Sequence, residues 1–147
     1  MIRRFESEDT EAVVKAWYAA SELAHPFLTT AFLKQEAENI RNIYIALAEI
    51  WVTEIDGKVV GFIALVENEI GGLFLDPAYH GRGLGHALVD KAVSKKGALT
   101  VAVFKENSIG RRFYRLYGFH RLHEFIHEET QQATLWLTFT PSNIARN

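Results

Sequence analysis

The sequence predicts a mixed α+β fold in which helices cover the faces of one mostly antiparallel sheet. The chain has 147 residues, which fits one domain and leaves little room for a second. Its expected elements run in the order β-α-α-β-β-β-α-β-α-β-β, and this is not the regular βαβ alternation of a doubly wound dinucleotide-binding fold. We expect one domain over residues 1–140 and a loose tail over residues 141–147.

The N-terminal part predicts a short strand and two helices. A strand is expected over residues 2–5, and a helix from its cap at Ser7 to about Leu23. A proline then separates this helix from a second one, which Thr29 or Thr30 caps. The apolar residues expected along one stripe of the second helix are Leu33, Ala37, Ile40, Tyr44 and Leu47.

A meander of three strands follows. Residues 50–55 and 58–66 are rich in β-branched and apolar residues, and the Asp56-Gly57 pair between them is typical of a hairpin turn. A third strand is expected over residues 70–75, before Pro77 ends it. These three strands should pair in antiparallel fashion.

The C-terminal half alternates between helices and strands. We expect a helix over residues 83–96, a strand over 99–104 and a second helix over 108–117, because a glycine follows each helix. Residues 119–126 and 133–139 should form a closing hairpin.

The composition excludes several kinds of protein. A net charge of −2 argues against a nucleic-acid-binding face, although Arg111, Arg112 and Arg115 could form a local basic patch. The absence of cysteine excludes disulfides, thiolate metal sites and a cysteine nucleophile. The six histidines lack metal-ligand spacing, and no apolar run is long enough for a membrane span. We therefore expect no metal, no nucleic-acid partner and no membrane partner, and a cytoplasmic location.

A glycine-rich turn, His80-Gly81-Arg82-Gly83-Leu84-Gly85-His86, lies between an expected strand and an expected helix. Glycines allow positive φ angles and close backbone approach, so successive N–H groups can point at an anion at the helix start. That arrangement suits a pyrophosphate. A Walker A loop needs Gly-Lys-Ser/Thr, and a dinucleotide fingerprint needs a further glycine, so neither fits. Taken alone, the turn is equally compatible with a flexible connection.

The residues around the turn make its role more specific. Leu73-Phe74-Leu75, an Asp76-Pro77 turn and the His80–Gly85 loop resemble motif A of the GCN5-related N-acetyltransferase (GNAT) superfamily. That motif is a strand, an Asp-Pro turn and R/Q-x-x-G-x-G/A opening a helix. His80 replaces the usual Arg or Gln at a position that mainly shapes the loop.

A second stretch resembles motif B of the same family, N-x-x-A-x-x-F/L-Y-x-x-x-G-F. Asn107, the Phe113-Tyr114 pair and the Gly118-Phe119 pair stand at the expected spacing, and Gly110 occupies the alanine position. Two motifs in order, on the expected elements, are far more specific than either alone.

The resemblance implies that acetyl-CoA lies in a V-shaped gap between two parallel strands, here residues 70–75 and 99–104. A bulge commonly splays the first strand in this family, and Gly71-Gly72 is a plausible place for it. The pantetheine arm would bond to the backbone of that strand, and the pyrophosphate would meet the N–H groups of the turn. The cofactor-binding residues expected on this basis are Leu73, Phe74, Leu75, Gly81, Arg82, Gly83, Leu84, Gly85, His86, Asn107 and Tyr114.

Tyr114 is the expected catalytic residue, because the family places this hydroxyl near the CoA sulfur. A phenol with a pKa of about 10 is protonated at neutral pH and can donate a proton to a departing thiolate. Phe113 and Tyr117 can share an apolar face one helical turn apart, so Tyr114 points elsewhere. The alternative is that Tyr114 is a structural residue packed on the sheet, while Tyr117 is expected in the core.

The acceptor side offers three candidates for the general base, namely Glu67, Glu69 and His25. The two glutamates flank a turn and are individually more typical of a solvated surface. His25 lies in a stretch that lines the acceptor pocket in many relatives, and it could equally cap a helix in a packed loop. Trp51, Phe62 and Trp136 are expected in the core. The late histidines His120, His123 and His127 are expected at the surface, although one could reach the pocket.

The function implied by the resemblance is transfer of an acetyl group from acetyl-CoA to a primary amine, by direct attack in a ternary complex. The acceptor could be a small-molecule amine or an amine of a peptide or protein, and the enzyme a monomer or a homodimer. One alternative is a non-catalytic acyl-CoA-binding or sensing module on the same fold. Another is a protein-interaction domain with a vestigial site.

Overall fold

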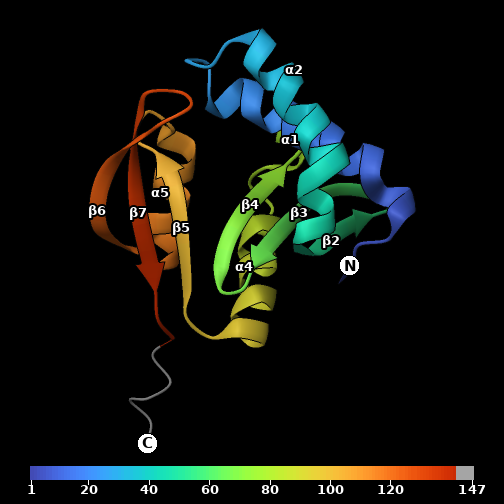
Figure 1. The fold of residues 1–147 in the computed structure, drawn as a ribbon. Helices are drawn as coiled ribbons and strands as arrows, with labels where there is room; N and C mark the ends of the chain where they lie inside the picture. Colours follow the sequence, from blue (N-terminus) through green and yellow to red (C-terminus); the bar gives the residue numbers. More distant parts are fainter. Residues whose placement is uncertain (142–147) are drawn as a thin grey trace, which may run out of the picture.

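The computed structural model describes residues 1–141, and it has a seven-stranded sheet in the order β1-β2-β3-β4-β5-β7-β6 (Figure 1). Neighbouring strands are antiparallel except β4 and β5, which are parallel. The strands are β1 (Ile2–Arg4), β2 (Glu49–Ile55), β3 (Lys58–Val66), β4 (Glu69–Leu75), β5 (Leu99–Phe104), β6 (His120–His127) and β7 (Gln132–Phe139). This confirms the mixed, mostly antiparallel sheet. The expected tail falls almost entirely outside the described residues, and the domain boundary at residue 140 stays a prediction.

Helices cover both faces of the sheet. One face carries α1 (Thr10–Ala24) and α2 (Thr30–Asn39), whose buried side chains form a core cluster with Ile50, Val52 and Phe62. The other face carries α4 (Leu84–Lys96) and α5 (Ser108–Tyr117), which pack on a second cluster (Figure 1). Within residues 1–141, no helix is long and apolar enough to cross a membrane.

The start of α1 differs from the expectation. Ser7 opens a short 3-10 turn, Ser7–Asp9, and its carbonyl accepts the Thr10 hydroxyl, so its side chain is not the cap. Glu6 holds the cap position of this turn, and its N–H donates to the Asp9 carboxylate at 2.8 Å, while Asp9 holds the cap position of α1. The prediction of a Ser7 cap was wrong because an extra tight turn precedes the α-helix.

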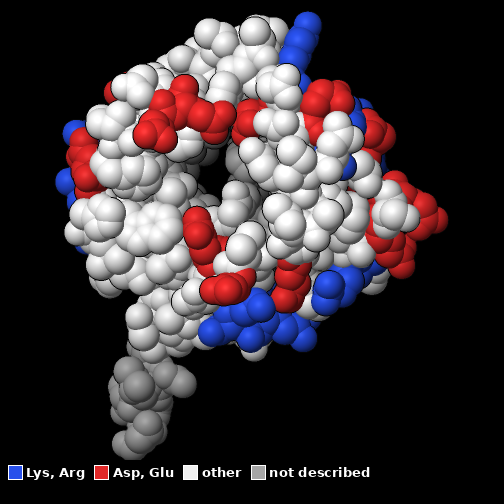
Figure 2. Space-filling model, viewed as in Figure 1, with Lys and Arg blue, Asp and Glu red and all other residues white. Residues whose placement is uncertain are grey.

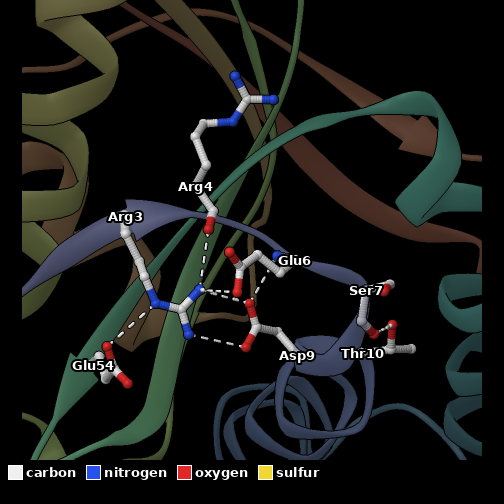
Figure 3. Close-up of polar contacts among 7 residues, drawn as sticks. All are labelled: Arg3, Arg4, Glu6, Ser7, Asp9, Thr10 and Glu54. Atoms are coloured by element: carbon white, nitrogen blue, oxygen red, sulfur yellow. Dashed lines mark hydrogen bonds and ion pairs between the residues drawn. The ribbon is translucent and has the colours of Figure 1, made fainter.

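Asp9 also anchors α1 to the sheet through charge (Figure 3). The Arg3 guanidinium donates to both Asp9 oxygens, at 2.8 and 3.0 Å, and its Nε donates to Glu54 at 3.2 Å. This two-point geometry is the strong form of an Arg–carboxylate contact. The bond from Arg3 holds the pKa of Asp9 below its usual value, although burial opposes the shift.

The second helix ends earlier than expected and continues as a π-helical segment, Ile40–Tyr44, before a short helix, α3 (Ile45–Leu47). Thr29 is its cap, since its hydroxyl accepts the Phe32 N–H. The stripe prediction holds as far as Ile40, but Tyr44 and Leu47 are 42% and 69% exposed. The wider π turn shifts later residues off the 3.6-residue repeat, so the expected stripe is wrong beyond Ile40.

The sheet splays between β4 and β5 where the resemblance implied it. The two strands pair only at Glu69 with Thr100 and at Ile70 with Val101. On the other side of β4, Ile70 pairs with β3 and so does Gly72, but Gly71 has no partner in that ladder. Gly71 is therefore a bulge.

The bulge changes which way the side chains of β4 face. Ile70 and Leu73 are three residues apart, yet both pack against the core cluster beneath α4. Strict alternation along a strand forbids this, and one extra residue allows it.

One tryptophan departs from the expected core. Trp51 and Phe62 are buried, at 9% and 4% exposed, but Trp136 on β7 is only half-buried and belongs to neither core cluster. The expectation for Trp136 was wrong, because β7 is next to the edge strand β6, and an antiparallel strand there can leave one face to solvent.

Candidate functional site

The cavity of interest opens where β4 and β5 diverge, and its volume is about 880 Å³. Its walls come from β4, β5, the starts of α4 and α5, and the layer made by α1, α2 and the π-helical segment. Figure 2 shows the molecule hollowed at this place, between its two halves. One cavity therefore joins the glycine-rich turn to the two N-terminal helices.

The glycine-rich turn has the backbone geometry that an anion site needs. Gly81 and Gly83 have φ angles of +80° and +78°, and Gly83 occupies the cap position of α4. Apart from each glycine and the chain next to it, no atom of the described residues lies within 4 Å of the point where a Cβ of either residue would be. The turn thus presents free space at the positive end of a helix.

The structure brings most of the expected turn residues to the cavity. Its lining includes Gly81, Gly83, Leu84, Gly85 and His86, but not Arg82. The Arg82 guanidinium instead lies 5.1 Å from the centre of the Tyr79 ring.

His80 and Gly85 shape the turn from either end. The His80 ring nitrogen Nε2 lies 3.1 Å from the Leu75 carbonyl oxygen, which agrees with a loop-shaping role. A Cβ on Gly85 would lie 3.2 Å from the Phe113 ring, so this glycine serves the contact between α4 and α5.

A polar link between α4 and α5 lies beside the turn, and the sequence reasoning missed it. Asp90 lies 3.1 Å from His86 Nδ1 and accepts the Tyr117 hydroxyl at 2.6 Å. The His86 and Tyr117 ring centres are 4.7 Å apart. The four-residue spacing of His86 and Asp90 was the available signal. Tyr117 packs its ring on the core, as expected, but its hydroxyl reaches the surface.

Tyr114 lies in the cavity wall and is buried, at 6% exposed. The centre of its ring lies 5.2 Å from the ring centre of Phe113 and 5.1 Å from that of Phe119. Burial raises the pKa of Tyr114 well above its usual value, so the hydroxyl carries its proton at neutral pH. Tyr114 also belongs to the core cluster beneath α4, so the same ring serves packing, while a protonated phenol in the cavity wall has a proton to donate.

His25 and Asn107 meet across the cavity wall, 82 positions apart in the chain. Asn107 caps α5: its Oδ1 accepts the Gly110 N–H at 2.8 Å, which places the amide Nδ2 3.2 Å from His25 Nε2. Because Nδ2 only donates, His25 Nε2 accepts, and the neutral ring carries its proton on Nδ1. Burial lowers the pKa of His25 to about 4.

Gly110 is what lets Asn107 take this position. A Cβ at residue 110 would lie 2.5 Å from Asn107 Nδ2, so an alanine there would push the amide away. The glycine at this motif position thus serves the side chain of Asn107.

The two glutamate candidates differ in environment, and neither lines the cavity. Glu67 is exposed in the turn between β3 and β4, with a φ of +55°. Glu69 is half-buried beside the splay, and burial raises its pKa. Since Ile70 faces α4, alternation turns Glu69 toward the face that carries α1 and α2.

One late histidine reaches the cavity, as the sequence allowed. His127 lines it, with its ring centre 5.5 Å from that of Phe104, while His120 and His123 are exposed. The Thr130 N–H donates to His127 Nδ1 at 3.3 Å. Over the described part of the chain, no group of three or more His, Asp or Glu side chains is placed to hold a metal ion.

Comparison with known proteins decides the family. A family model described as the Acetyltransferase (GNAT) domain matches residues 46–121. Peptidyl-lysine N-acetyltransferase YiaC of Escherichia coli strain K12 is 30% identical over 142 residues, which span 96% of this chain and 97% of that protein. The chain belongs to the GNAT acetyltransferase family. It is an N-acetyltransferase that uses acetyl-CoA.

Other GNAT proteins support the same assignment. Peptidyl-lysine N-acetyltransferase YjaB of Salmonella typhimurium is 32% identical over 119 residues, covering 80% of this chain and 81% of that protein. The solution structure of apo YjaB from Escherichia coli superposes with a TM-score of 0.85 at 27% identity, over 95% of this chain and 96% of that one. PaiA N-acetyltransferase from Thermoplasma acidophilum in complex with coenzyme A shares the fold, with a TM-score of 0.76, 18% identity and coverage of 96% and 98%.

Proposed function

We propose that this GNAT enzyme transfers the acetyl group of acetyl-CoA directly to the primary amine of a lysine side chain in a peptide or protein. The observation that carries the proposal is the single cavity that joins the glycine-rich turn, Tyr114 and the α1–α2 layer, because donor and acceptor can then meet without a covalent enzyme intermediate. The names of the relatives YiaC and YjaB support lysine as the acceptor.

The donor side would hold acetyl-CoA largely through backbone groups. The pyrophosphate would meet the N–H groups at the start of α4, from Gly81 to His86. The pantetheine arm would bond to the edge of β4 at Leu73 and Leu75, since β4 has no β5 pairing beyond Ile70. Phe74 would contribute only its backbone, because its ring packs between Trp17 and Phe62.

The chemical step would be attack of the neutral amine on the thioester carbonyl. A new C–N bond forms, the C–S bond breaks, and the departing thiolate takes the proton of the Tyr114 hydroxyl. The attacking nitrogen then gives up its extra proton, and this proton, passed through water, restores the Tyr114 hydroxyl. A backbone N–H of β4 near the bulge would stabilise the negative charge that develops on the carbonyl oxygen.

The proton that the acceptor ammonium loses needs a separate base. We propose Glu69 acting through water, because its raised pKa and its position beside the splay suit that task. Glu67 is exposed in the turn between β3 and β4. We propose no base role for His25, whose ring is neutral, bound to Asn107 and a weak proton acceptor with a pKa of about 4.

Replacing Tyr114 by phenylalanine tests the proposed function. Tyr114→Phe should lower kcat for acetylation of a lysine peptide about 100-fold, because general-acid catalysis is lost. The affinity for acetyl-CoA, measured by calorimetry, should stay within about two-fold, because the ring still fills its place. Tyr18→Phe is the matched control, since Tyr18 does not line the cavity. An unchanged kcat in Tyr114→Phe would remove the general-acid role.

A further inference from the structure

The cavity wall formed by α2, the π-helical segment and α3 is apolar except for one carboxylate and the hydroxyl of Tyr44. Glu36 is the only Asp or Glu among the lining residues of the described chain, and no Lys or Arg lines the cavity there. The apolar lining residues of this wall are Leu28, Phe32, Ile40, Ile45, Leu47 and Ala48. A ligand in this part of the cavity therefore meets apolar surface and a single negative charge.

Glu36 is oriented but not neutralised by the protein. Its Oε1 accepts the Asn39 side-chain N–H at 2.8 Å, and Glu36 is half-buried. No ion pair within residues 1–141 includes Glu36. Glu38, two positions along and on another face of the helix, pairs with Arg41 at 2.6 Å. The contrast leaves Glu36 available to a cation that comes from outside.

The pKa of a neighbouring tyrosine, Tyr44, is affected by negative charges from two different parts of the fold. The pKa of Tyr44 is raised first by burial, and then by the charges of Glu36 and Glu129. Glu36 belongs to α2, whereas Glu129 lies in the turn between β6 and β7. Figure 2 shows acidic side chains on the rim of the hollow and basic ones gathered away from it. The acceptor end of the cavity thus favours positive charge.

We propose that Glu36 is a specificity-determining residue that binds a second cationic group of the acceptor. The inference rests on the proposed function and names its substrate class. The amine that attacks acetyl-CoA must first lose its proton, so it cannot hold a positive charge against Glu36 during the reaction. A benefit from Glu36 must come from another charge, joined to the reacting nitrogen by an apolar stem that fits the wall. A lysine next to another basic residue has this chemistry, and so does an aliphatic diamine.

The experiment compares acceptors that differ only in the second charge. One pair is a lysine peptide with a neighbouring arginine and the same peptide with glutamine instead. The other pair is hexamethylenediamine and hexylamine, and together the pairs separate peptides from small diamines as the source of the charge. The wild-type enzyme should show a lower KM for the doubly charged member of at least one pair, by about ten-fold at low salt.

The variant Glu36→Gln should remove that preference. Its KM for the doubly charged acceptor should rise about ten-fold, while kcat, the KM for the singly charged acceptor and the affinity for acetyl-CoA stay unchanged. Glu38→Gln, on the same helix but outside the cavity lining, is the matched control and should keep the preference. A further readout is salt, which should reduce the wild-type preference and not affect Glu36→Gln.

The possible failures are distinguishable. Transfer by the wild type without any preference for the second charge would overturn the role of Glu36 alone. An equal rise in KM for both members of a pair in Glu36→Gln would also overturn it, because a general packing effect would then explain the change. Binding of acetyl-CoA without transfer to any of the four acceptors would overturn the proposed function together with this inference.

Discussion

The two ends of the cavity are built in different ways. At the donor end, the proposed recognition is by the backbone: two glycines with positive φ, a helix start and a strand edge freed by the bulge at Gly71. At the acceptor end, side chains from α1, α2 and the π-helical segment form the wall, and only Glu36 among them carries charge. Backbone recognition leaves a motif in the sequence, because it demands glycine at fixed positions. Side-chain recognition leaves none, and it is also what can differ between relatives that share a donor.

The largest effect is expected at the donor end, from Gly83→Ala. An alanine at a φ of +78° strains the turn, and its Cβ enters the space where the anion would sit. Acetyl-CoA affinity should fall about 100-fold by calorimetry. Gly57→Ala is the matched control, because Gly57 has a φ of +77° and the same open surroundings but lies in the hairpin before β3. Equal affinity in the two variants would show that the turn does not bind the cofactor.

The contact between His25 and Asn107 joins the acceptor end of the cavity to the donor end. We expect the buried His25 ring to make the free energy of unfolding depend on pH. The pKa of His25 is lowered from 6.5 to about 4, so between these values the unfolded chain binds a proton that the folded chain does not. Stability contributed by the neutral ring is present above pH 6.5 and is lost as pH falls toward 4. Urea unfolding should show a loss of about 1.5 kcal/mol from pH 6.5 to pH 5 that is attributable to His25.

The matched variant is His25→Gln, which does not titrate and can still accept from Asn107. It should lack that part of the pH dependence, so the difference between the two proteins isolates His25 from other groups such as Glu69. If the free energy of unfolding depended on pH in the same way in both proteins, the His25 ring would have to be accessible to protons in the folded state.

A smaller effect is expected from Gly110→Ala, which tests the contact between Asn107 and His25 where the two ends of the cavity meet. The new Cβ would displace the Asn107 amide from His25, at a cost of about 1 kcal/mol for one lost hydrogen bond. NMR titration should show the pKa of His25 moving from its lowered value toward its ordinary one, since the ring gains access to water. Retention of the wild-type titration would mean that Asn107 accommodates the methyl group without leaving His25.

The sequence predicted the helices and strands around the donor end well because the information for them is local. The strands, the turn and α4 follow from glycine and proline positions and from hydrophobic periodicity, so their bounds were nearly right. The π-helical segment escaped prediction, since a wide turn inside a helix has no marker of its own and moved Tyr44 and Leu47 off the expected stripe. The contact between His25 and Asn107 spans 82 positions, which only the tertiary fold brings together.

The most direct test of the whole account is steady-state kinetics on four proteins: the wild type, Gly83→Ala, Glu36→Gln and the double variant. The two residues lie on elements that cover opposite faces of the sheet, so their effects should be independent. We predict that Gly83→Ala raises only the KM for acetyl-CoA, that Glu36→Gln raises only the KM for a doubly charged lysine peptide, and that the double variant shows both changes unaltered. A rise in the peptide KM from Gly83→Ala, or in the acetyl-CoA KM from Glu36→Gln, would contradict the division of one cavity into a donor end and an acceptor end.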